Sequence, residues 1–188
     1  PRDNNNNKTA RFDSFNQFLK YGQTNKHALP ICDSEFKFVA ELMHETDGWE
    51  NAVTKNWVTV DCKTISLPDS EFEGNMIRAS AHFEGISVEM LMYQSACIAA
   101  RKKWDKLLKH AQVVHHIDGC DIIYGQVNAP IITTREYCNY RRFLKVSDDR
   151  FIVLQRSCNR PDIEELLPDD STRKNVIRAE NYILAFEY

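Results

Sequence analysis

Residues 101–108, with the sequence RKKWDKLL, combine residue types that can bind a phosphate. On a helix, which turns by about 100° per residue, Arg101 and Asp105 fall on one face together with Trp104 and Leu108. An arginine and an aspartate at this spacing form either an exposed ion pair, worth about 0.3 to 0.5 kcal/mol, or a buried pair in which each charge must satisfy the other. In the buried case, the remaining donors of the guanidinium can hold a phosphate group.

The opposite face of this helix carries four lysines, Lys102, Lys103, Lys106 and Lys109. Each basic residue close to an anionic membrane contributes about 1 kcal/mol of binding. This face is therefore either a membrane-docking surface or an ordinary solvated helix face. The whole chain has 24 Lys and Arg against 27 Asp and Glu, a net charge of −3, so we expect no nucleic-acid partner.

A second informative segment, residues 136–144, has the alternation of a strand. Tyr137, Asn139 and Arg141 alternate with Cys138, Tyr140 and Arg142. Each face of such a strand would carry polar and aromatic groups, unlike the Val, Ile and Leu packing of a dry core. The pattern is typical either of an exposed edge strand or of a face that lines a ligand cavity.

No residue pattern in the chain indicates catalysis or a bound cofactor. His115 and His116 lie near Cys120, but adjacent histidines on a strand point to opposite faces, so we predict no metal site there. The sequence contains no Gly-rich phosphate loop, no GxSxG elbow and no HExxH motif. We therefore predict a protein that is not an enzyme and needs no cofactor.

The composition is that of one globular domain without a membrane span. Of 188 residues, 43% are hydrophobic and 27% charged, which leaves enough interior for a core and a cavity. The six cysteines are spread through the chain without close pairs, and the apolar stretch 86–100 is too short for a bilayer of about 30 Å. No signal peptide is recognised. These features predict a cytoplasmic protein whose contact with membranes is peripheral.

The order of apolar periods predicts an α+β fold. We expect a disordered tail over 1–10, two helices within 11–45, an antiparallel strand pair over 57–62 and 76–83, a helix capped by Ser87 and a short helix over 99–108. Strands are predicted over 113–118, 121–127, 136–144, 150–157 and 176–186. One domain over 11–188 would then wrap a curved antiparallel sheet around helices.

Three segments in this order, RKKWD, TTREYCNYRRF and VIRAENY, strongly resemble the START lipid-transfer domain. Trp49 and the helix over 87–93 fit as well, so the resemblance runs from about Trp49 to the end. It implies a helix-grip fold with an internal hydrophobic cavity that holds one lipid for transfer between membranes. A START domain continues beyond the VIR strand with further strands and a lid helix, so the resemblance implies that the chain is incomplete at its C-terminus or completed by another chain.

Within the family, the motifs are similar to those of the phosphatidylcholine-transfer branch. By this resemblance Arg101 binds the phosphate, Asp105 partners it, and Tyr137 and Tyr182 belong to an aromatic cage for choline, where each ring contributes about 0.5 to 2 kcal/mol. The resulting set of predicted lipid-binding residues is Arg101, Asp105, Tyr137, Tyr182, Arg141 and Tyr124.

The third cage aromatic of that branch falls at Gly125 in this chain. Sterol or ceramide binding by the same fold therefore remains an alternative, as does a lipid-sensing module of a larger protein. In each case the predicted partner is a lipid, with transient contact to a membrane surface.

Overall fold

The computed structural model describes residues 14, 15, 17, 18, 20, 21, 29–67, 71, 73–128, 133–169, 173 and 175–188. The tail predicted over 1–10 lies outside these residues. The chain packs as two compact units, the first formed by residues 1–20 and 33–86 and the second by residues 21–32 and 87–188. The single domain predicted over 11–188 stays a prediction.

The first unit contains a helix and a three-stranded antiparallel sheet of order β1-β2-β3. Its elements are α2 (Asp33–His44), β1 (Glu50–Lys55), β2 (Val58–Ser66) and β3 (Glu73–Ala81). The predicted strand pair corresponds to β2 and β3, whereas β1 was not predicted. Asn56, with a φ of 55°, adopts the left-handed conformation that closes the β1–β2 turn.

Arg78 on β3 ties this sheet to the end of α2. Its guanidinium donates to Asp61 Oδ2 at 3.0 Å and to the carbonyls of Met43 and Glu45 at 3.2 and 2.7 Å. The same group lies 4.3 Å from the centroid of the Trp49 ring. Because one planar cation satisfies partners on the strands and at the helix terminus, it fixes the register of this unit.

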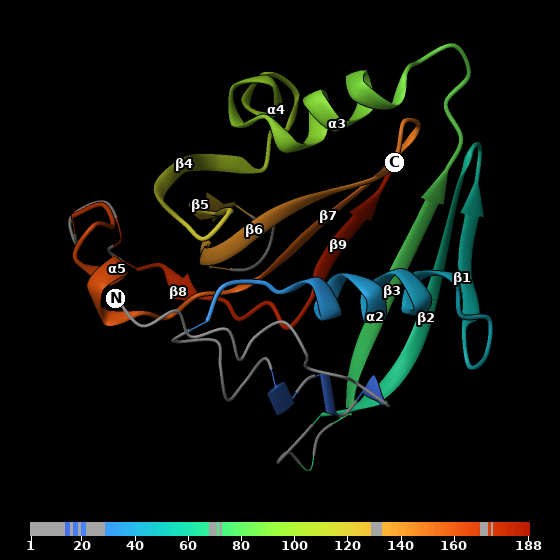
Figure 1. Ribbon diagram of the computed structural model, residues 1–188, viewed down its shortest axis with the longest axis horizontal. Coiled ribbons are helices and arrows are strands. Elements are labelled where there is room, and N and C mark those ends of the chain that lie inside the picture. Colours follow the sequence, from blue (N-terminus) through green and yellow to red (C-terminus); the bar gives the residue numbers. More distant parts are fainter. Residues whose placement is uncertain are drawn as a thin grey trace. The chain divides into compact units, whose positions relative to one another are not determined.

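The second unit combines two consecutive helices with a six-stranded sheet. The helices are α3 (Val88–Ala96) and α4 (Ile98–Trp104), and the strands are β4 (Leu108–Ile117), β5 (Cys120–Val127), β6 (Arg135–Ser147), β7 (Arg150–Ser157), β8 (Ile177–Arg178) and β9 (Leu184–Glu187). The short helix α5 (Pro161–Glu164) follows β7. The sheet order is β4-β5-β6-β7-β9, with β8 pairing parallel to β6 (Figure 1).

Local sequence signals account for several boundaries in this unit. The Ser87 hydroxyl accepts from the Met90 N–H at 3.3 Å, which is the predicted cap of α3. Asp118 and Gly119 both have positive φ values, 46° and 74°, and they make the tight β4–β5 hairpin turn. The curved antiparallel sheet with few helices confirms the predicted α+β, helix-grip class.

The second helix differs from the prediction. It was expected over 99–108, but α4 ends at Trp104 and Asp105 is already extended, with φ −80° and ψ 93°. The chain then enters β4 at Leu108, because backbone pairing with Val127 takes over from helical hydrogen bonds. The final strand predicted over 176–186 is likewise two short strands, β8 and β9, separated by a bend.

The core of the second unit lies along the central strands β5, β6 and β7. Ile122, Tyr124, Tyr140, Ile152 and Leu154 are all at most 1% exposed. Strand register places Tyr124 opposite Cys138 and Ile122 opposite Tyr140, so these side chains share one face of the sheet. Ile123, Gly125, Tyr137, Asn139 and Arg141 must then lie on the other face.

Candidate functional site

The predicted pair of Arg101 and Asp105 is formed. Arg101 Nε donates to Asp105 Oδ2 at 2.9 Å, and the side chains are 30% and 13% exposed, so the pair is neither fully buried nor a loose surface contact. Asp105 is itself held, since its Oδ1 accepts from the Leu107 N–H at 3.1 Å. Within the described residues, both terminal nitrogens of Arg101 lack a hydrogen-bond partner. The aspartate therefore orients the guanidinium and leaves its two outer donors for a ligand.

Trp104, which the helical wheel groups with Arg101, is exposed and bonded to α3. It is the last residue of α4 and 53% exposed, and its indole N–H donates to the Gln94 carbonyl at 2.9 Å. The early end of the helix lets the indole reach back to α3.

Arg141 uses its donors differently. Its Nε and Nη2 donate to Asp121 Oδ2 at 3.2 and 2.6 Å, and its Nη1 donates to the Ala96 carbonyl at 2.6 Å. The side chain is only 9% exposed. Arg141 thus joins strands β5 and β6 to the end of α3, and each of its three nitrogens already has an acceptor.

A small cavity lies where these elements meet. Its volume is about 20 Å³, which is room for about one water molecule. The lining residues come from both helices and from strands of the sheet: Ser95, Ala96, Ile98, Arg101, Leu108, Ala111, Ile123, Tyr124, Tyr137, Arg141 and Gln155. Four of the six predicted site residues, Arg101, Arg141, Tyr124 and Tyr137, are in this set.

Tyr137 fills the space above Gly125. The two residues are direct cross-strand neighbours, and a Cβ at position 125 would collide with the far end of the Tyr137 ring. Burial raises the pKa of Tyr137, while the positive charges of Arg101 and Arg141 oppose this shift and the charge of Asp105 adds to it. By the family resemblance, the third cage aromatic would fall at position 125. In this chain the ring of Tyr137, another predicted cage residue, fills the space there.

Tyr124 directs its hydroxyl away from Arg101. The hydroxyl donates to Glu136 Oε2 at 2.8 Å and accepts from Gln126 Nε2 at 2.6 Å. Burial and the hydrogen bond to Glu136 raise its pKa to about 12. Its polar contacts thus lie on the sheet face opposite Tyr137.

Glu136 anchors a charged cluster on that opposite face, which the sequence analysis missed. It accepts from Arg173 at 2.8 Å and from Arg178 at 2.9 Å, and both arginines also pair with Glu164 of α5. Burial raises the pKa of Glu136, but the hydrogen bonds from Arg173, Tyr124 and Arg178 outweigh it and hold the pKa below its ordinary value. Glu136 and Arg178 belong to two of the three motifs behind the resemblance, which was the available signal.

Tyr182 lies in the bend between β8 and β9 and is half-buried. It does not line the cavity, and no contact joins it to Tyr137 or Arg101 among the described residues. Its neighbour Asn181 instead donates to Asn139 Oδ1 at 3.3 Å. The predicted aromatic cage is not assembled in this arrangement.

Buried amides next to the cavity were also missed. Asn139 and Gln155 are 0% and 6% exposed, and Asn139 Nδ2 donates to Gln155 Oε1 at 3.5 Å. The Asn181 N–H donates to Ser157 Oγ at 2.8 Å, which extends the chain of polar groups. The polar alternation of 136–144 was the signal, and it marks a polar inner wall of the sheet.

The residues considered for a metal site have other partners. His116 Nδ1 lies 2.8 Å from Asp121 Oδ1, and Cys120 Sγ faces the Ile31 carbonyl at 3.9 Å. In the part of the chain that the structure describes, no three His, Cys, Asp or Glu side chains gather as metal ligands would. Of the helices in that part, none combines the length and apolar character needed to cross a bilayer.

Three solved structures share this fold. The structure of human STARD10 superposes with a TM-score of 0.69 at 19% identity, covering 85% of this chain and 61% of that one. Human StAR-related lipid transfer protein 5 gives a TM-score of 0.65 at 18% identity, covering 79% of this chain and 67% of that one. A STAR-related lipid transfer protein from Xanthomonas axonopodis gives 0.53 at 16% identity, covering 76% and 80%.

The chain therefore spans less than two thirds of the length of the STARD10 structure. A comparison with curated protein sequences gave no match. A comparison with protein families matches residues 33–185, which include both α2 and the whole of the candidate site, to the START domain. This chain belongs to the START domain family.

Proposed function

We propose that this protein binds one phospholipid of the phosphatidylcholine type and carries it through the cytoplasm between membranes. The observation that carries the proposal is the state of Arg101. Asp105 holds its Nε at 2.9 Å, while both outer nitrogens lack partners among the described residues. A guanidinium oriented in this way presents two parallel donors, the arrangement that matches two oxygens of a phosphate.

The contrast with Arg141 supports the choice of Arg101. Both arginines line the same cavity, but Arg141 is already bound by Asp121 and by the Ala96 carbonyl. A phosphate would have to displace these contacts, at the cost of leaving a buried carboxylate and a carbonyl unpaired. In this proposal Arg141 holds α3 on the sheet and Arg101 takes the ligand.

For a cationic headgroup, we propose the Tyr137 ring as the aromatic contact, since it is buried and near the charges of Arg101 and Asp105. A quaternary ammonium is attracted to a ring face with about 0.5 to 2 kcal/mol. Tyr182 remains the proposed second ring, and it would have to approach Tyr137 when the lipid is bound.

Lipid entry at this position requires an opening of the second unit. The cavity of about 20 Å³ is far smaller than a phospholipid, so α3 and α4 must separate from the sheet. The contacts that hold them include the Arg141 bond to the Ala96 carbonyl and the contact of Ser95 Oγ with the Tyr188 hydroxyl. Acyl chains that enter would stabilise the open form by about 25 cal/mol per Å² of apolar surface removed from water.

The test is lipid transfer by the Arg101→Ala variant. Hydrogen bonds to charged groups contribute about 1.5 to 3 kcal/mol, so transfer of labelled phosphatidylcholine between vesicles should fall about 10- to 100-fold. The matched control is Arg160→Ala, which also breaks an arginine–aspartate pair, with Asp162 at 2.7 Å, but lies outside the cavity. Normal transfer by Arg101→Ala would contradict the proposal.

A second candidate is a sterol or ceramide, favoured by the buried amides. Asn139 and Gln155 offer donors and acceptors beside the cavity without any charge, and such groups suit a hydroxyl or an amide rather than a phosphate. Mass spectrometry of lipids extracted from the purified protein separates the two candidates. Recovery of sterol or ceramide without phospholipid would replace the phosphatidylcholine proposal.

A further inference from the structure

Helices α3 and α4 expose a group of large apolar side chains. Met90 and Tyr93 on α3 are each 51% exposed, Trp104 at the end of α4 is 53% exposed, and Leu107 in the following turn is 45% exposed. We call these four residues the apolar half of the α3–α4 surface. Hydrophobic side chains of this size gathered on two adjacent elements mark an interaction site more often than isolated ones do.

Hydrogen bonds link two of these side chains, Trp104 and Met90, through Gln94. The Trp104 indole donates to the Gln94 carbonyl at 2.9 Å, which fixes the ring at the end of α3. Gln94 Nε2 in turn lies 3.8 Å from Met90 Sδ, one helical turn away. Tyr93 follows Met90 by three residues and so lies on the same side of α3. The patch is therefore continuous across the two helices.

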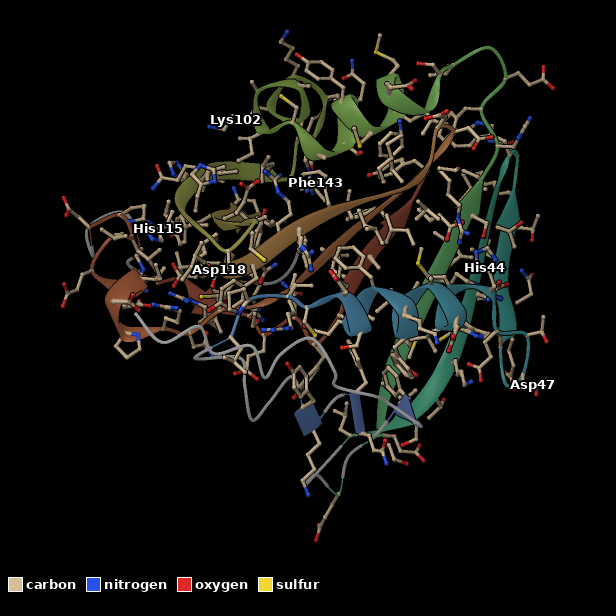
Figure 2. All side chains as sticks on the ribbon, viewed as in Figure 1. His44, Asp47, Lys102, His115, Asp118 and Phe143 are labelled. Atoms are coloured by element: carbon tan, nitrogen blue, oxygen red, sulfur yellow. The ribbon has the colours of Figure 1, made fainter. Side chains whose placement is uncertain are left out.

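The same segment carries a local positive charge. Between residues 88 and 109 there are five basic side chains and two acidic ones, whereas the whole chain has a net charge of −3. One of the acidic residues, Asp105, is paired with Arg101. The lysines at 102, 103, 106 and 109 are exposed, and none forms an ion pair within the described residues. Figure 2 shows Lys102 on the outer side of α4.

We propose that the α3–α4 surface, made up of the apolar half and the four lysines, docks on an anionic lipid bilayer. Unpaired lysines are attracted to the negative surface of such a membrane, by about 1 kcal/mol each. Tryptophan and tyrosine, with an apolar ring and one polar tip, are the side chains that settle at the boundary between headgroups and hydrocarbon. Charge alone would also suit an acidic protein, but exposed lysines in the same segment as half-exposed aromatic and methionine side chains suit a partner that combines negative charge with an accessible apolar layer.

Docking in this orientation would bring the proposed lipid site to the membrane. Arg101 and the first two lysines share α4, which has only seven residues, Ile98–Trp104. This part of the inference rests on the proposed function, whereas membrane binding itself does not. The surface can therefore be tested without any lipid transfer.

The experiment measures binding of the full chain to vesicles by flotation. Vesicles of phosphatidylcholine alone are compared with vesicles that contain about 30% phosphatidylserine, in low salt and in about 0.5 M salt, where screening shortens the range of exposed charges to a few Å. We expect binding only to the anionic vesicles in low salt. Equal binding to both kinds of vesicle, or no binding to either, would overturn the proposal.

A four-lysine variant tests whether these lysines are the charges that attract the membrane. Replacing the lysines at 102, 103, 106 and 109 by glutamine should lower anionic-vesicle binding about 600-fold, since each contributes about fivefold, or 1 kcal/mol. The matched control removes four exposed lysines elsewhere, Lys20, Lys37, Lys55 and Lys145, and so changes the net charge equally. Equal losses in the two variants would overturn the assignment to α3 and α4.

Quenching of tryptophan fluorescence tests whether the apolar half of the α3–α4 surface enters the membrane. With brominated lipids in the anionic vesicles, part of the tryptophan fluorescence should be quenched, and this part should be missing in Trp104→Phe. If quenching persists in Trp104→Phe, another tryptophan inserts into the membrane, and the proposed orientation of the α3–α4 surface is overturned. If polyglutamate competes fully for the site while no quenching occurs, the partner is an acidic protein and the membrane proposal fails.

The outcomes separate this inference from the proposed function. Arg101→Ala should bind anionic vesicles like the unaltered protein while losing transfer, and the four-lysine variant should still yield co-purified lipid. Loss of vesicle binding in Arg101→Ala would contradict the separation of the two surfaces.

Discussion

The two faces of the β5–β6–β7 sheet each hold arginines against carboxylates, but the two clusters differ in how many donors remain unpaired. On one face, Glu136 accepts from Arg173, Arg178 and Tyr124, and both arginines continue to Glu164. On the other face, Asp105 engages only the Nε of Arg101. In the first cluster Nε and Nη2 of each arginine have carboxylate acceptors, and the cluster joins β6 to α5. The second cluster is incomplete, since among the described residues only Nε of Arg101 has an acceptor.

The largest effect should come from breaking the Glu136 cluster. Glu136→Gln keeps the size of a side chain that is 4% exposed but leaves Arg173 and Arg178 with only the more exposed carboxylate of Glu164. Removing one partner of a buried ion pair costs about 3 to 5 kcal/mol. Urea denaturation measures this loss. A change below about 1 kcal/mol would show that the cluster does not hold the fold together.

The second prediction concerns the contact between Gly125 and Tyr137. In a strand alanine is ordinarily more stable than glycine, but a Cβ at this position would collide with the Tyr137 ring. We expect Gly125→Ala to lower the free energy of unfolding by about 1 to 3 kcal/mol, the usual cost of overpacking. In a Tyr137→Ala background the same change should cost much less, which a double-mutant cycle measures. Equal losses of unfolding free energy in both backgrounds would mean that the Tyr137 ring moves aside without cost.

The third prediction uses pH to sharpen the comparison. The pKa of Glu136 is lowered in the folded protein, so its ionised form contributes stability above the unfolded pKa, and this contribution is lost as pH falls through the folded pKa. The difference in unfolding free energy between the unaltered protein and Glu136→Gln should therefore shrink in acid. The effect is smaller than the substitution itself, since only the part linked to ionisation is lost. A difference that does not change with pH would contradict the role of the charge.

Sequence reasoning found the features that depend on neighbouring residues. The i, i+4 spacing predicted the contact of Arg101 with Asp105, and the two adjacent strands predicted over 113–118 and 121–127 correspond to β4 and β5. It failed where distant segments decide. The end of α4 depends on pairing of Leu108 with Val127, 19 positions later in the chain.

The clusters within the sheet show the same limit. Glu136 and Arg178 lie 42 residues apart, and only the parallel pairing of β8 with β6 brings them together. The filling of Gly125 by Tyr137 likewise depends on the cross-strand register. Family resemblance identified these residues as motif positions without saying that Glu136 and Arg178 bind each other.

The last prediction has the smallest effect on stability and tests the incomplete cluster directly. Asp105→Asn keeps an oxygen for the Leu107 N–H but removes the charge that orients Arg101. Because Arg101 is 30% exposed, we expect a loss of at most about 1 kcal/mol in urea denaturation, the range of solvent-accessible pairs. Lipid transfer should nevertheless fall, since the guanidinium is no longer held in one orientation. A loss of stability as large as that of Glu136→Gln, with transfer unchanged, would reverse the roles of the two clusters, because Asp105 would then hold the fold and not the ligand site.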